Sequence, residues 1–501
     1  MKHKLLYLFT ASALLLGACK KGYLDINDNP NASTSASSSL VLTGALNTTA
    51  ASTTGNTIFY TFAGQWMNYW ATTGGVSGWF EERTYNFTSN WGGSTVLWAN
   101  AYDNLEDYYY IEPKAKAEGK LFYVAIAKTM KAWDYSYLVD FYGNVPYSQA
   151  LQSTKFITPK YDKAQDIYED LAKQLDSAAT IFKTVTVAAV DKKYDIYTQG
   201  DPLAWGRFAN TIKLRMLMRQ TEMPGRAAYI TTEIAKITAN GMGYIGTGQS
   251  IKSNPGYSNT SGKQNPFYSY FGYTTATDVT AATGRNYYLA SNYGMNFLKD
   301  NSDPRLGRIY NTINDGVGTT YASLVFGGDP ANTDTKTNIS TIGVGLANSS
   351  AQDQYMMTDF ESLFIQSEMA LKGYITGDAR ALYQAAVTAN FVYLGLTADQ
   401  ATTYMSEQTV GDWDSNDDKL ALIIKQKWAA MNGTNDIEPW SDYRRLELPA
   451  DMPISVASGV TTKKIPVRML YPQNEYNFNS ANVAAEGNIS QFTSRLFWDV
   501  K

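Results

Sequence analysis

The chain has 501 residues, with 42 Lys and Arg against 46 Asp and Glu, a formal net charge of −4 and 44% hydrophobic residues. These values are typical of a globular protein, and the lack of a basic surplus argues against a nucleic-acid partner. The only histidine is His3 and the only cysteine is Cys19. Beyond residue 19, this excludes Ser-His-Asp and Cys-His nucleophiles and zinc sites built on His or Cys.

The first 18 residues are typical of a secretory signal peptide. Lys2 and Lys4 precede an apolar run over residues 5–16, which is shorter than the roughly 20 residues that a membrane-spanning helix needs. The LGAC sequence that ends at Cys19 also resembles the bacterial lipobox, in which cleavage exposes the cysteine for acylation. We therefore expect a lipoprotein signal peptide over 1–18, although an ordinary signal with a chance cysteine is the alternative. Residues 19–39 predict a lipidated, flexible tether.

Two stretches combine aromatic rings with small polar residues, which suits the recognition of sugars. Trp and Tyr offer flat apolar faces to the C–H side of a sugar ring, while amides and hydroxyls bond its OH groups. The first stretch spans residues 65–91 and the second spans 254–278. The candidate ligand-binding residues are Trp70, Trp79, Tyr257, Tyr268, Tyr270 and Tyr273. Trp70 lies at helical spacing from Trp66 and fits the core equally well, and Trp98 is predicted to be core.

Helical periodicity is clear in two other regions. In residues 160–182, apolar side chains recur on one face opposite acids and lysines. In residues 358–373, Thr358 precedes Glu361 by three positions, which predicts a capping box, and Gly373 predicts the end of the helix. A second helix is expected over 378–395 after a short turn. This pair resembles a tetratricopeptide unit, and residues 121–151 with 160–182 form a second candidate unit.

Residues 241–355 are rich in Gly, Asn, Thr, Ser and Tyr and have few helical periods. The simplest interpretation is a mainly α-helical scaffold that carries a large loop-rich insertion at about 241–355. Loops on a rigid scaffold commonly carry binding residues.

The acidic segment 411–419 is similar to a calcium-binding loop through Asp412, Asp414 and Asn416. It lacks the glycine at the sixth position, and its twelfth position is Ile423 instead of a carboxylate. We therefore predict no metal site here, and instead a solvated loop that caps a helix beginning near Lys419. No cofactor is predicted.

Six segments in order resemble the SusD/RagB family of nutrient-binding outer-membrane lipoproteins. They are YLDINDNPN (23–31), LVDFYGNVPYSQAL (138–151), NSDPRL (301–306), FESLFIQSEMALKGY (360–374), the run 423–449 and the run 465–483. The resemblance implies a mainly α, SusD-like fold with tetratricopeptide-like helix pairs over residues 40–501. It also implies binding without catalysis and a SusC-like TonB-dependent transporter as partner, with oligosaccharides or peptides as ligands.

The resemblance further implies a lipid-anchored protein at the outer membrane, facing the cell surface. Surface-exposed members often carry acids after the lipidated cysteine, whereas Lys20 and Lys21 stand there in this chain. Net charge favours neutral or cationic peptides if the ligand is a peptide. Loop tyrosines of the second stretch could contact the transporter instead of a ligand.

Two family motifs also have a structural interpretation. Ser302 or Asp303 can cap a helix with Pro304 in its first turn. Asp442, Arg444 and Arg445 predict an ion-paired junction, with capture of an anionic ligand as the alternative.

Two other classes of function are consistent with the sequence. A carboxylate glycosidase needs two acids in an aromatic cleft, and no motif selects them among the 46 acids. The other class is a helical scaffold that binds only its transporter.

Overall fold

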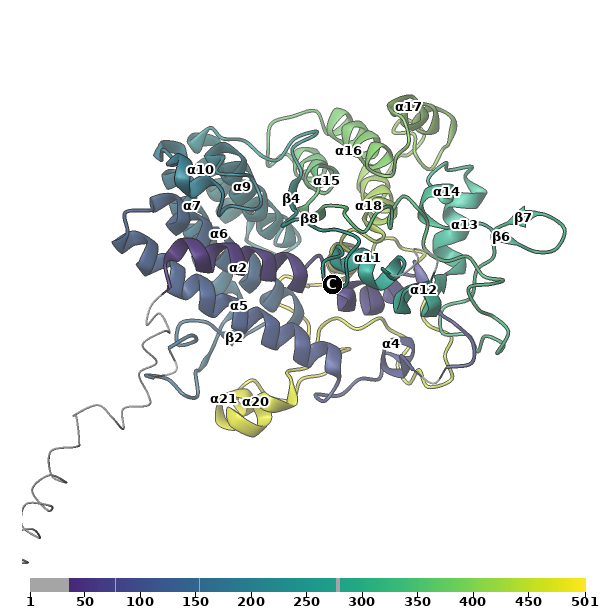
Figure 1. Ribbon diagram of the computed structural model, residues 1–501, viewed down its shortest axis with the longest axis horizontal. Helices are drawn as coiled ribbons and strands as arrows, with labels where there is room; N and C mark the ends of the chain where they lie inside the picture. The colour runs from purple at the N-terminus through teal and green to yellow at the C-terminus, as the bar shows by residue number, and fades with distance from the viewer. Residues whose placement is uncertain (1–35, 77, 153, 276–279) are drawn as a thin grey trace, which may run out of the picture. The chain divides into compact units, whose positions relative to one another are not determined.

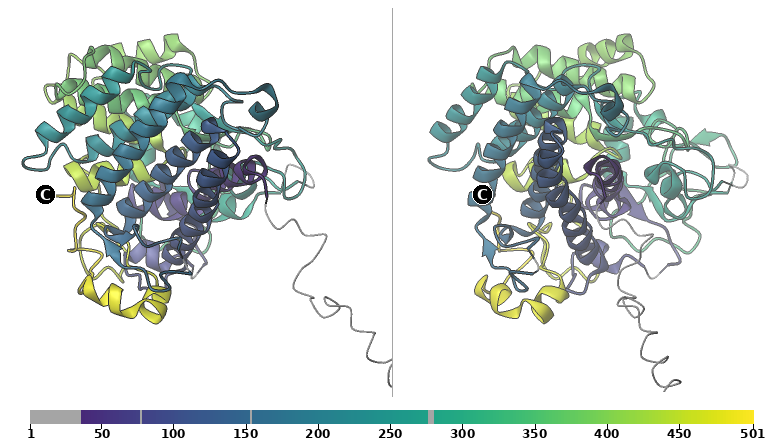
Figure 2. Two further views of the ribbon diagram at one scale, coloured as in Figure 1. Left: turned by 90° about the vertical axis from the view of Figure 1, so that its left-hand side faces the viewer. Right: turned by 60° about the vertical axis from the view of Figure 1, so that its left-hand side comes forward.

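The computed structural model describes residues 36–76, 78–152, 154–275 and 280–501. The expected signal peptide over 1–18, Cys19 and all of the expected tether up to residue 35 lie outside the described residues. The unit Ser38–Lys501 is mainly α-helical (Figures 1 and 2), as the sequence predicts.

One set of long helices forms the N-terminal half of this unit. Its members are α2 (Ser38–Ser52), α5 (Gly92–Ala117), α6 (Leu121–Tyr142), α7 (Ala164–Thr184), α9 (Pro202–Arg219) and α10 (Ala227–Asn240). Helix α5 packs between α2 and α6, and α7 packs between α6 and α9. The predicted helix 160–182 corresponds to α7, and the whole of its predicted apolar face is buried. The packing of α6 on α7 confirms that these helices form a pair.

A second set of helices follows the loop-rich stretch. It comprises α15 (Asp359–Leu371), α16 (Ala379–Tyr393), α17 (Ala398–Glu407), α18 (Lys419–Met431) and α19 (Ile437–Leu446). The predicted pair α15–α16 is confirmed, because the two helices pack along their lengths. Helix α15 also joins the two sets: Met369 packs in one cluster with Leu217 of α9, while Phe364 packs in another with Tyr383 of α16.

A buried ionic junction ties α19 to both sets of helices. Arg445 pairs with Glu368 of α15 at 2.5 Å and with Asp442 at 2.9 Å, and its side chain is fully buried. The guanidinium of Arg444 lies 3.6 Å from the ring centroid of Trp440 and donates to the Asp140 carbonyl oxygen at 2.6 Å. The structural interpretation of this motif is therefore confirmed, and its alternative, capture of an anionic ligand, is wrong because these side chains are committed to internal partners.

The remaining elements are short. The helices are η1 (Phe59–Ala63), α3 (Gly64–Trp66), α4 (Phe80–Thr84), α8 (Ala189–Lys192), α11 (Pro266–Phe271), α12 (Thr283–Tyr287), α13 (Asn292–Asp300), α14 (Leu306–Ile309), α20 (Gln473–Phe478) and α21 (Ser480–Ala485). The antiparallel strand pairs are β1 (Trp70–Thr72) with β5 (Tyr288–Ala290), β2 (Val145–Pro146) with β3 (Tyr161–Asp162), β4 (Ile251–Ser253) with β8 (Gln354–Met357), and β6 (Ile313–Asn314) with β7 (Thr319–Thr320). Helices α11 to α14 and strands β4 to β7 lie in the stretch 241–355, between α10 and α15, and β8 crosses its end.

The predicted cap at Ser302–Asp303 takes a different form. Helix α14 begins only at Leu306, and the Asp303 carboxylate is fully buried in an ion pair with Arg305 at 2.7 Å. Asp303 also accepts the Arg305 backbone N–H at 2.9 Å. The aspartate thus fixes a buried arginine, which is a tertiary role that local capping rules do not anticipate.

Asp134 of α6 gives the fold a testable pH dependence. Burial raises the pKa of this carboxyl to about 8, opposed by a hydrogen bond from Asn104 Nδ2 at 3.0 Å. Because the folded-state pKa lies above the unfolded value, the folded chain holds a proton that the unfolded chain has lost, and stability falls as pH rises from about 4 to about 8.

We expect Asp134→Asn to remove this dependence. The new amide can donate to Asn104 Oδ1, a buried oxygen that otherwise has no partner. Thermal unfolding should be measured at pH 5 and pH 9. Between these pH values the stability of the variant relative to the wild type should rise by on the order of 1.4 kcal/mol for each unit of pKa shift. If the difference in stability between the two proteins is the same at both pH values, Asp134 does not have a raised pKa in the folded chain.

Candidate functional site

The pairing of β1 with β5 brings two distant aromatic segments together. Trp70 pairs with Ala290 and Thr72 pairs with Tyr288. The chain that leads out of β5 turns at Ser291 into α13, beside Asn68 at the entrance to β1, where the Gly294 N–H donates to the Asn68 carbonyl oxygen at 3.1 Å. This short sheet therefore sets the position of α13.

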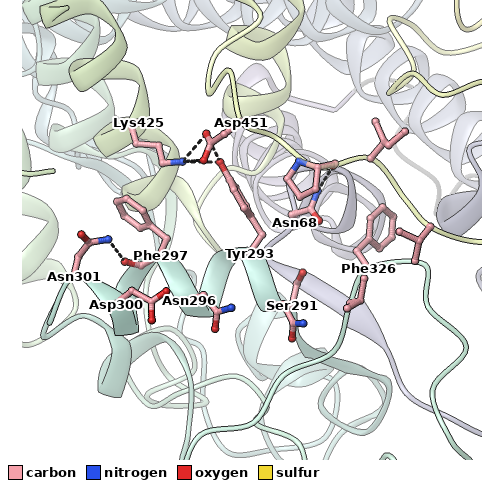
Figure 3. A pocket seen from close by; sticks show the side chains of 15 residues that line it. Asn68, Ser291, Tyr293, Asn296, Phe297, Asp300, Asn301, Phe326, Lys425 and Asp451 are labelled. Atoms are coloured by element: carbon pink, nitrogen blue, oxygen red, sulfur yellow. Dashed lines mark hydrogen bonds and ion pairs between the residues drawn. The ribbon is translucent and has the colours of Figure 1, made fainter.

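A pocket of about 440 Å³ opens along α13, and we call it the Tyr293 pocket (Figure 3). Helix α13 presents Tyr293, Asn296, Phe297 and Asp300 to it at spacings of three and four residues, which place side chains on one helical face. The opposite walls come from distant parts of the chain. Its other lining residues are Asn68, Ser291, Asn292, Asn301, Val325, Phe326, Lys425, Asp451, Pro453, Ile454 and Val456.

Lys425, Tyr293 and Asp451 form a closed polar cluster at one end of the pocket. Lys425 Nζ donates to the Tyr293 hydroxyl at 2.6 Å and lies 3.0 Å from Asp451 Oδ1, and the Tyr293 hydroxyl donates to the same oxygen at 2.7 Å. The ammonium also lies 4.6 Å from the Tyr293 ring centroid and 5.1 Å from that of Phe297. Its positive charge is therefore satisfied within the protein and is not presented to a ligand.

The same contacts shift the pKa values of both charged groups. Burial lowers the pKa of Lys425, opposed by the hydrogen bond and charge of Asp451. Burial raises the pKa of Asp451, but the hydrogen bonds from Tyr293 and Lys425 outweigh it, so this pKa lies below its ordinary value. Asp451 is consequently ionised near neutral pH and cannot serve there as a proton donor.

Buried aromatic packing holds the wall of the pocket in place. The Trp428 ring lies 5.1 Å from Tyr293 and 5.4 Å from Phe297, and its indole N–H donates to the Met67 carbonyl oxygen at 3.0 Å. Asn68 Nδ2 donates to the Pro453 carbonyl oxygen at 2.8 Å on the other side. By contrast, the exposed side chains of Asn296 and Asp300 have no partner among the described residues.

These features fit a polyhydroxylated ligand. Two ring side chains offer apolar faces, the Asn amides both donate and accept hydrogen bonds, and Asp300 accepts them. The two carboxylates and one ammonium of the lining leave the pocket with a net charge of −1. Among the described residues, no cluster of His, Cys, Asp or Glu could hold a metal ion.

Trp79, the first of the sequence candidates, is partly buried and lies outside the Tyr293 pocket. Its ring centroid is 5.1 Å from that of Tyr287 and 5.3 Å from that of Tyr288, and the neighbouring Phe80 is 49% exposed. Trp79 has φ = 58°, a left-handed conformation that is unusual for a bulky residue and is enriched at ligand-binding sites. We call this surface, made of Trp79, Phe80 and Tyr287, the Trp79 patch.

The other sequence candidates are more deeply placed. Trp70 is only 4% exposed and packs on Tyr310, and Tyr268 is 8% exposed. Both rings pack in the hydrophobic core, which for Trp70 agrees with the core alternative that its helical spacing from Trp66 left open. Trp66 is likewise fully buried, and Trp98 is 8% exposed with its ring packed in the core.

The remaining tyrosines are partly buried and take other partners. Tyr270 packs edge-on against Phe271, and the Tyr273 ring lies 4.4 Å from the Arg285 guanidinium. Tyr257 sits in a loop where its backbone N–H donates to the Asn254 side chain at 2.9 Å. None of the six candidates lines the Tyr293 pocket.

The segment 411–419 folds on itself through short-range contacts. Asp412 accepts from the Ser415 backbone N–H at 2.9 Å, and Asp414 pairs with Arg380 at 2.6 Å. The Asp418 side chain accepts the Ala421 N–H at 2.9 Å at the start of α18. The predicted helix cap is therefore confirmed.

Comparison with known proteins settles the family. A family model described as SusD-like, starch-binding and associating with outer membrane, matches residues 30–472. The chain belongs to the SusD-like family. No curated protein matches it.

Solved SusD-like structures share the fold. A chitin-binding SusD homologue from Flavobacterium johnsoniae is 24% identical with a TM-score of 0.75, over 92% of this chain and 99% of that one. A SusD homologue from Bacteroides fragilis is 21% identical with a TM-score of 0.74, over 93% and 100%. A SusD/RagB family protein from Bacteroides thetaiotaomicron is 20% identical with a TM-score of 0.74, over 93% and 99%. Within the described part of this SusD-like chain, no helix has the length and apolar character needed to cross a membrane.

Proposed function

We propose that this SusD-like protein binds an oligosaccharide in the Tyr293 pocket, leaves it chemically unchanged and delivers it to a SusC-like TonB-dependent transporter. The lining of the pocket carries the proposal, since Tyr293 and Phe297 stand beside unpartnered Asn296 and Asp300. The family description as starch-binding and the chitin-binding relative are consistent with a glycan ligand.

We further propose that the Trp79 patch provides a second aromatic contact for the same ligand. Trp79 and Tyr287 meet at 5.1 Å beside exposed Phe80, and this surface lies next to the β1–β5 pair that also positions α13. Tyr270, Tyr273 and Tyr257 remain candidate contacts for ligand or transporter.

The pocket does not favour glycoside hydrolysis. That reaction needs one carboxyl group with a raised pKa to protonate the leaving group. Asp451 has the opposite shift because Tyr293 and Lys425 stabilise its anion. The proposal is therefore one of binding alone.

Calorimetric titration with neutral oligosaccharide pools and, separately, with tryptic peptide digests tests the proposal. Saturable binding of a glycan pool, with the sugar recovered intact, is the expected result. Binding of peptides alone would instead support the peptide-binding alternative, and release of new reducing ends would overturn the assignment as a binding protein.

Anchoring at the outer membrane through lipid on Cys19 completes the proposal. The support is the LGAC sequence after the apolar run, and several acyl chains would hold the protein firmly, since each buried CH₂ contributes about 0.8 kcal/mol. Growth with labelled palmitate should label the wild type and not Cys19→Ser. Unlabelled wild-type protein released into the medium would contradict this part of the proposal.

Charge in the pocket predicts discrimination against acidic glycans. With Lys425 neutralised by Asp451, a uronic-acid oligosaccharide meets the residual charge of Asp300. Asp451→Asn frees the ammonium, and a charge change at about 4 Å in water is worth about 1 kcal/mol, or about fivefold in affinity.

We therefore expect Asp451→Asn to increase the affinity for the acidic oligosaccharide relative to a neutral one, as measured by parallel titrations at low salt. Asp414→Asn, which alters a distant exposed ion pair with Arg380, is the matched control and should leave the ratio unchanged. If the ratio of the affinity for the acidic oligosaccharide to that for the neutral one is the same in the wild type and both variants, charge in the pocket does not select the ligand.

A further inference from the structure

A second hollow, of about 380 Å³, lies far along the fold from the Tyr293 pocket and shares no lining residue with it. One wall is α5, another is the loop between β2 and β3, and α20 closes the third side. In Figure 1, α5, β2 and α20 lie in the lower left part of the unit, whereas α13 and α4 lie on the right. We call this hollow the Trp98 pocket.

The floor of the Trp98 pocket is aromatic and fixed. Trp98 and Tyr102, one helical turn apart on α5, have ring centroids 5.0 Å apart. The Trp98 ring also packs edge-on against Tyr142 at 5.0 Å, and the Tyr102 hydroxyl donates to the Pro146 carbonyl oxygen at 2.7 Å. At the rim, Ile157 is 88% exposed. Because Trp98 is itself only 8% exposed, the apolar surface open to a ligand comes mainly from the partly buried Tyr102 and from Ile157.

Carboxylates surround this floor. Asp103 and Glu106 of α5 also line the pocket, are exposed, and have no ion-pair or hydrogen-bond partner among the described residues. Glu475 of α20 is held by the Tyr161 hydroxyl at 2.7 Å. Among the described residues, no lysine or arginine lines the pocket. Lys155, in the same β2–β3 loop, lies over the ring of the lining residue Phe156, 5.0 Å from its centroid.

The two pockets differ in the hydrogen-bond donors among their lining side chains. A sugar presents many hydroxyl oxygens that need donors. The Tyr293 pocket is lined by four asparagines, of which Asn68 and Asn301 also donate to backbone carbonyl oxygens, whereas Asn296 has no partner among the described residues. In the part of the chain that the structure describes, no Asn, Gln, Lys or Arg lines the Trp98 pocket, and the Tyr102 hydroxyl already donates to the Pro146 carbonyl oxygen. Its polar groups are acceptors, which suits a ligand that only donates.

We propose that the Trp98 pocket binds an organic cation, that is, an ammonium or guanidinium group on an apolar stem. The stem lies against Tyr102 and the Ile157 rim, above the largely buried Trp98, and the cation meets the Tyr102 ring and the carboxylates of Asp103 and Glu106. A cation is attracted to the face of an aromatic ring, and the attraction between opposite charges adds to this at low ionic strength. The site is separate from the proposed glycan function.

The test is a titration of the full chain with Nα-acetylargininamide and with Nα-acetylcitrullinamide, called argininamide and citrullinamide below. Neither carries a charged α-amine, and they differ only in the replacement of guanidinium by uncharged urea. Tryptophan fluorescence and calorimetry should detect saturable binding of argininamide that weakens as salt is raised, and at least tenfold weaker binding of citrullinamide. Binding of argininamide should fall at least tenfold in the double variant Asp103→Asn, Glu106→Gln. Both substitutions are at exposed positions, and an unchanged thermal unfolding midpoint verifies the fold.

The control is Asp300→Asn, which removes an exposed carboxylate from the other pocket and should leave argininamide binding unchanged. The proposal is overturned if argininamide shows no saturable binding or if the two amides bind equally. It is also overturned if the double variant still binds argininamide like the wild type, or if Asp300→Asn weakens that binding.

Discussion

Tyr293→Ala is expected to weaken oligosaccharide binding by at least about 30-fold, which corresponds to the roughly 2 kcal/mol that a well-packed aromatic anchor contributes. The substitution removes the aromatic wall of the pocket and leaves Lys425 and Asp451 without the hydroxyl that bridges them at 2.6 and 2.7 Å. Calorimetric titration with the glycan that binds the wild type measures the effect.

Two further variants separate the parts of this effect. Tyr293→Phe keeps the ring and removes the hydroxyl, so a smaller loss is expected. Trp79→Ala deletes a ring from the Trp79 patch and should cost less than Tyr293→Ala if the pocket is the principal site. If Tyr293→Ala unfolds like the wild type and binds glycan equally well, the Tyr293 pocket is not the binding site.

Glu438→Ala is expected to lower the free energy of unfolding by about 3–5 kcal/mol, the range for breaking a buried ion pair from one side. Glu438 is fully buried and lies 2.6 Å from Arg219, 3.6 Å from Arg215 and 3.7 Å from Lys427. Its loss leaves three cations on α9 and α18 with one fewer counter-charge. Denaturant unfolding at pH 7 measures the change.

The exposed pair of Arg380 and Asp414 is the control for this prediction. Its atoms also meet at 2.6 Å, yet both side chains are largely in solvent, so Asp414→Ala should cost less than about 1 kcal/mol. The pKa of Glu438 is lowered by Arg219, Arg215 and Lys427 against the opposing effect of burial. Ionised Glu438 therefore stabilises the folded chain at pH values above the ordinary glutamate pKa. This stabilisation is lost progressively as pH falls below that value. If Glu438→Ala and Asp414→Ala lower the free energy of unfolding equally, the buried ion pairs of Glu438 do not stabilise the fold more than an exposed pair does.

Local sequence patterns predicted where the helices lie. They did not predict which long-range partners the side chains in these segments take. The predicted helix 160–182 begins at Ala164 because Tyr161 and Asp162 pair with β2 instead. Thr358 caps α15 as expected, accepting the Glu361 N–H at 3.2 Å. The second half of the predicted capping box does not form, since the Glu361 side chain pairs with Arg215 at 3.2 Å.

The candidate site was much less predictable. Residues 292–301 do carry a local signal, because Asn and aromatic residues recur there at helical spacing. Lys425 and Asp451, however, lie 132 and 158 positions from Tyr293, and no local pattern links them. Aromatic density selected Trp70 and Tyr268, yet density does not distinguish a ring that faces solvent from one that fills the core. Only the burial of the folded chain makes that distinction.

A crystal structure of the protein soaked with the neutral oligosaccharide that binds most tightly would show where this ligand lies. We expect an intact sugar chain in the Tyr293 pocket, with one ring against Tyr293 or Phe297 and hydroxyls bonded to Asn296 and Asp300. A cleaved sugar, or an intact chain bound elsewhere with this pocket empty, would contradict it.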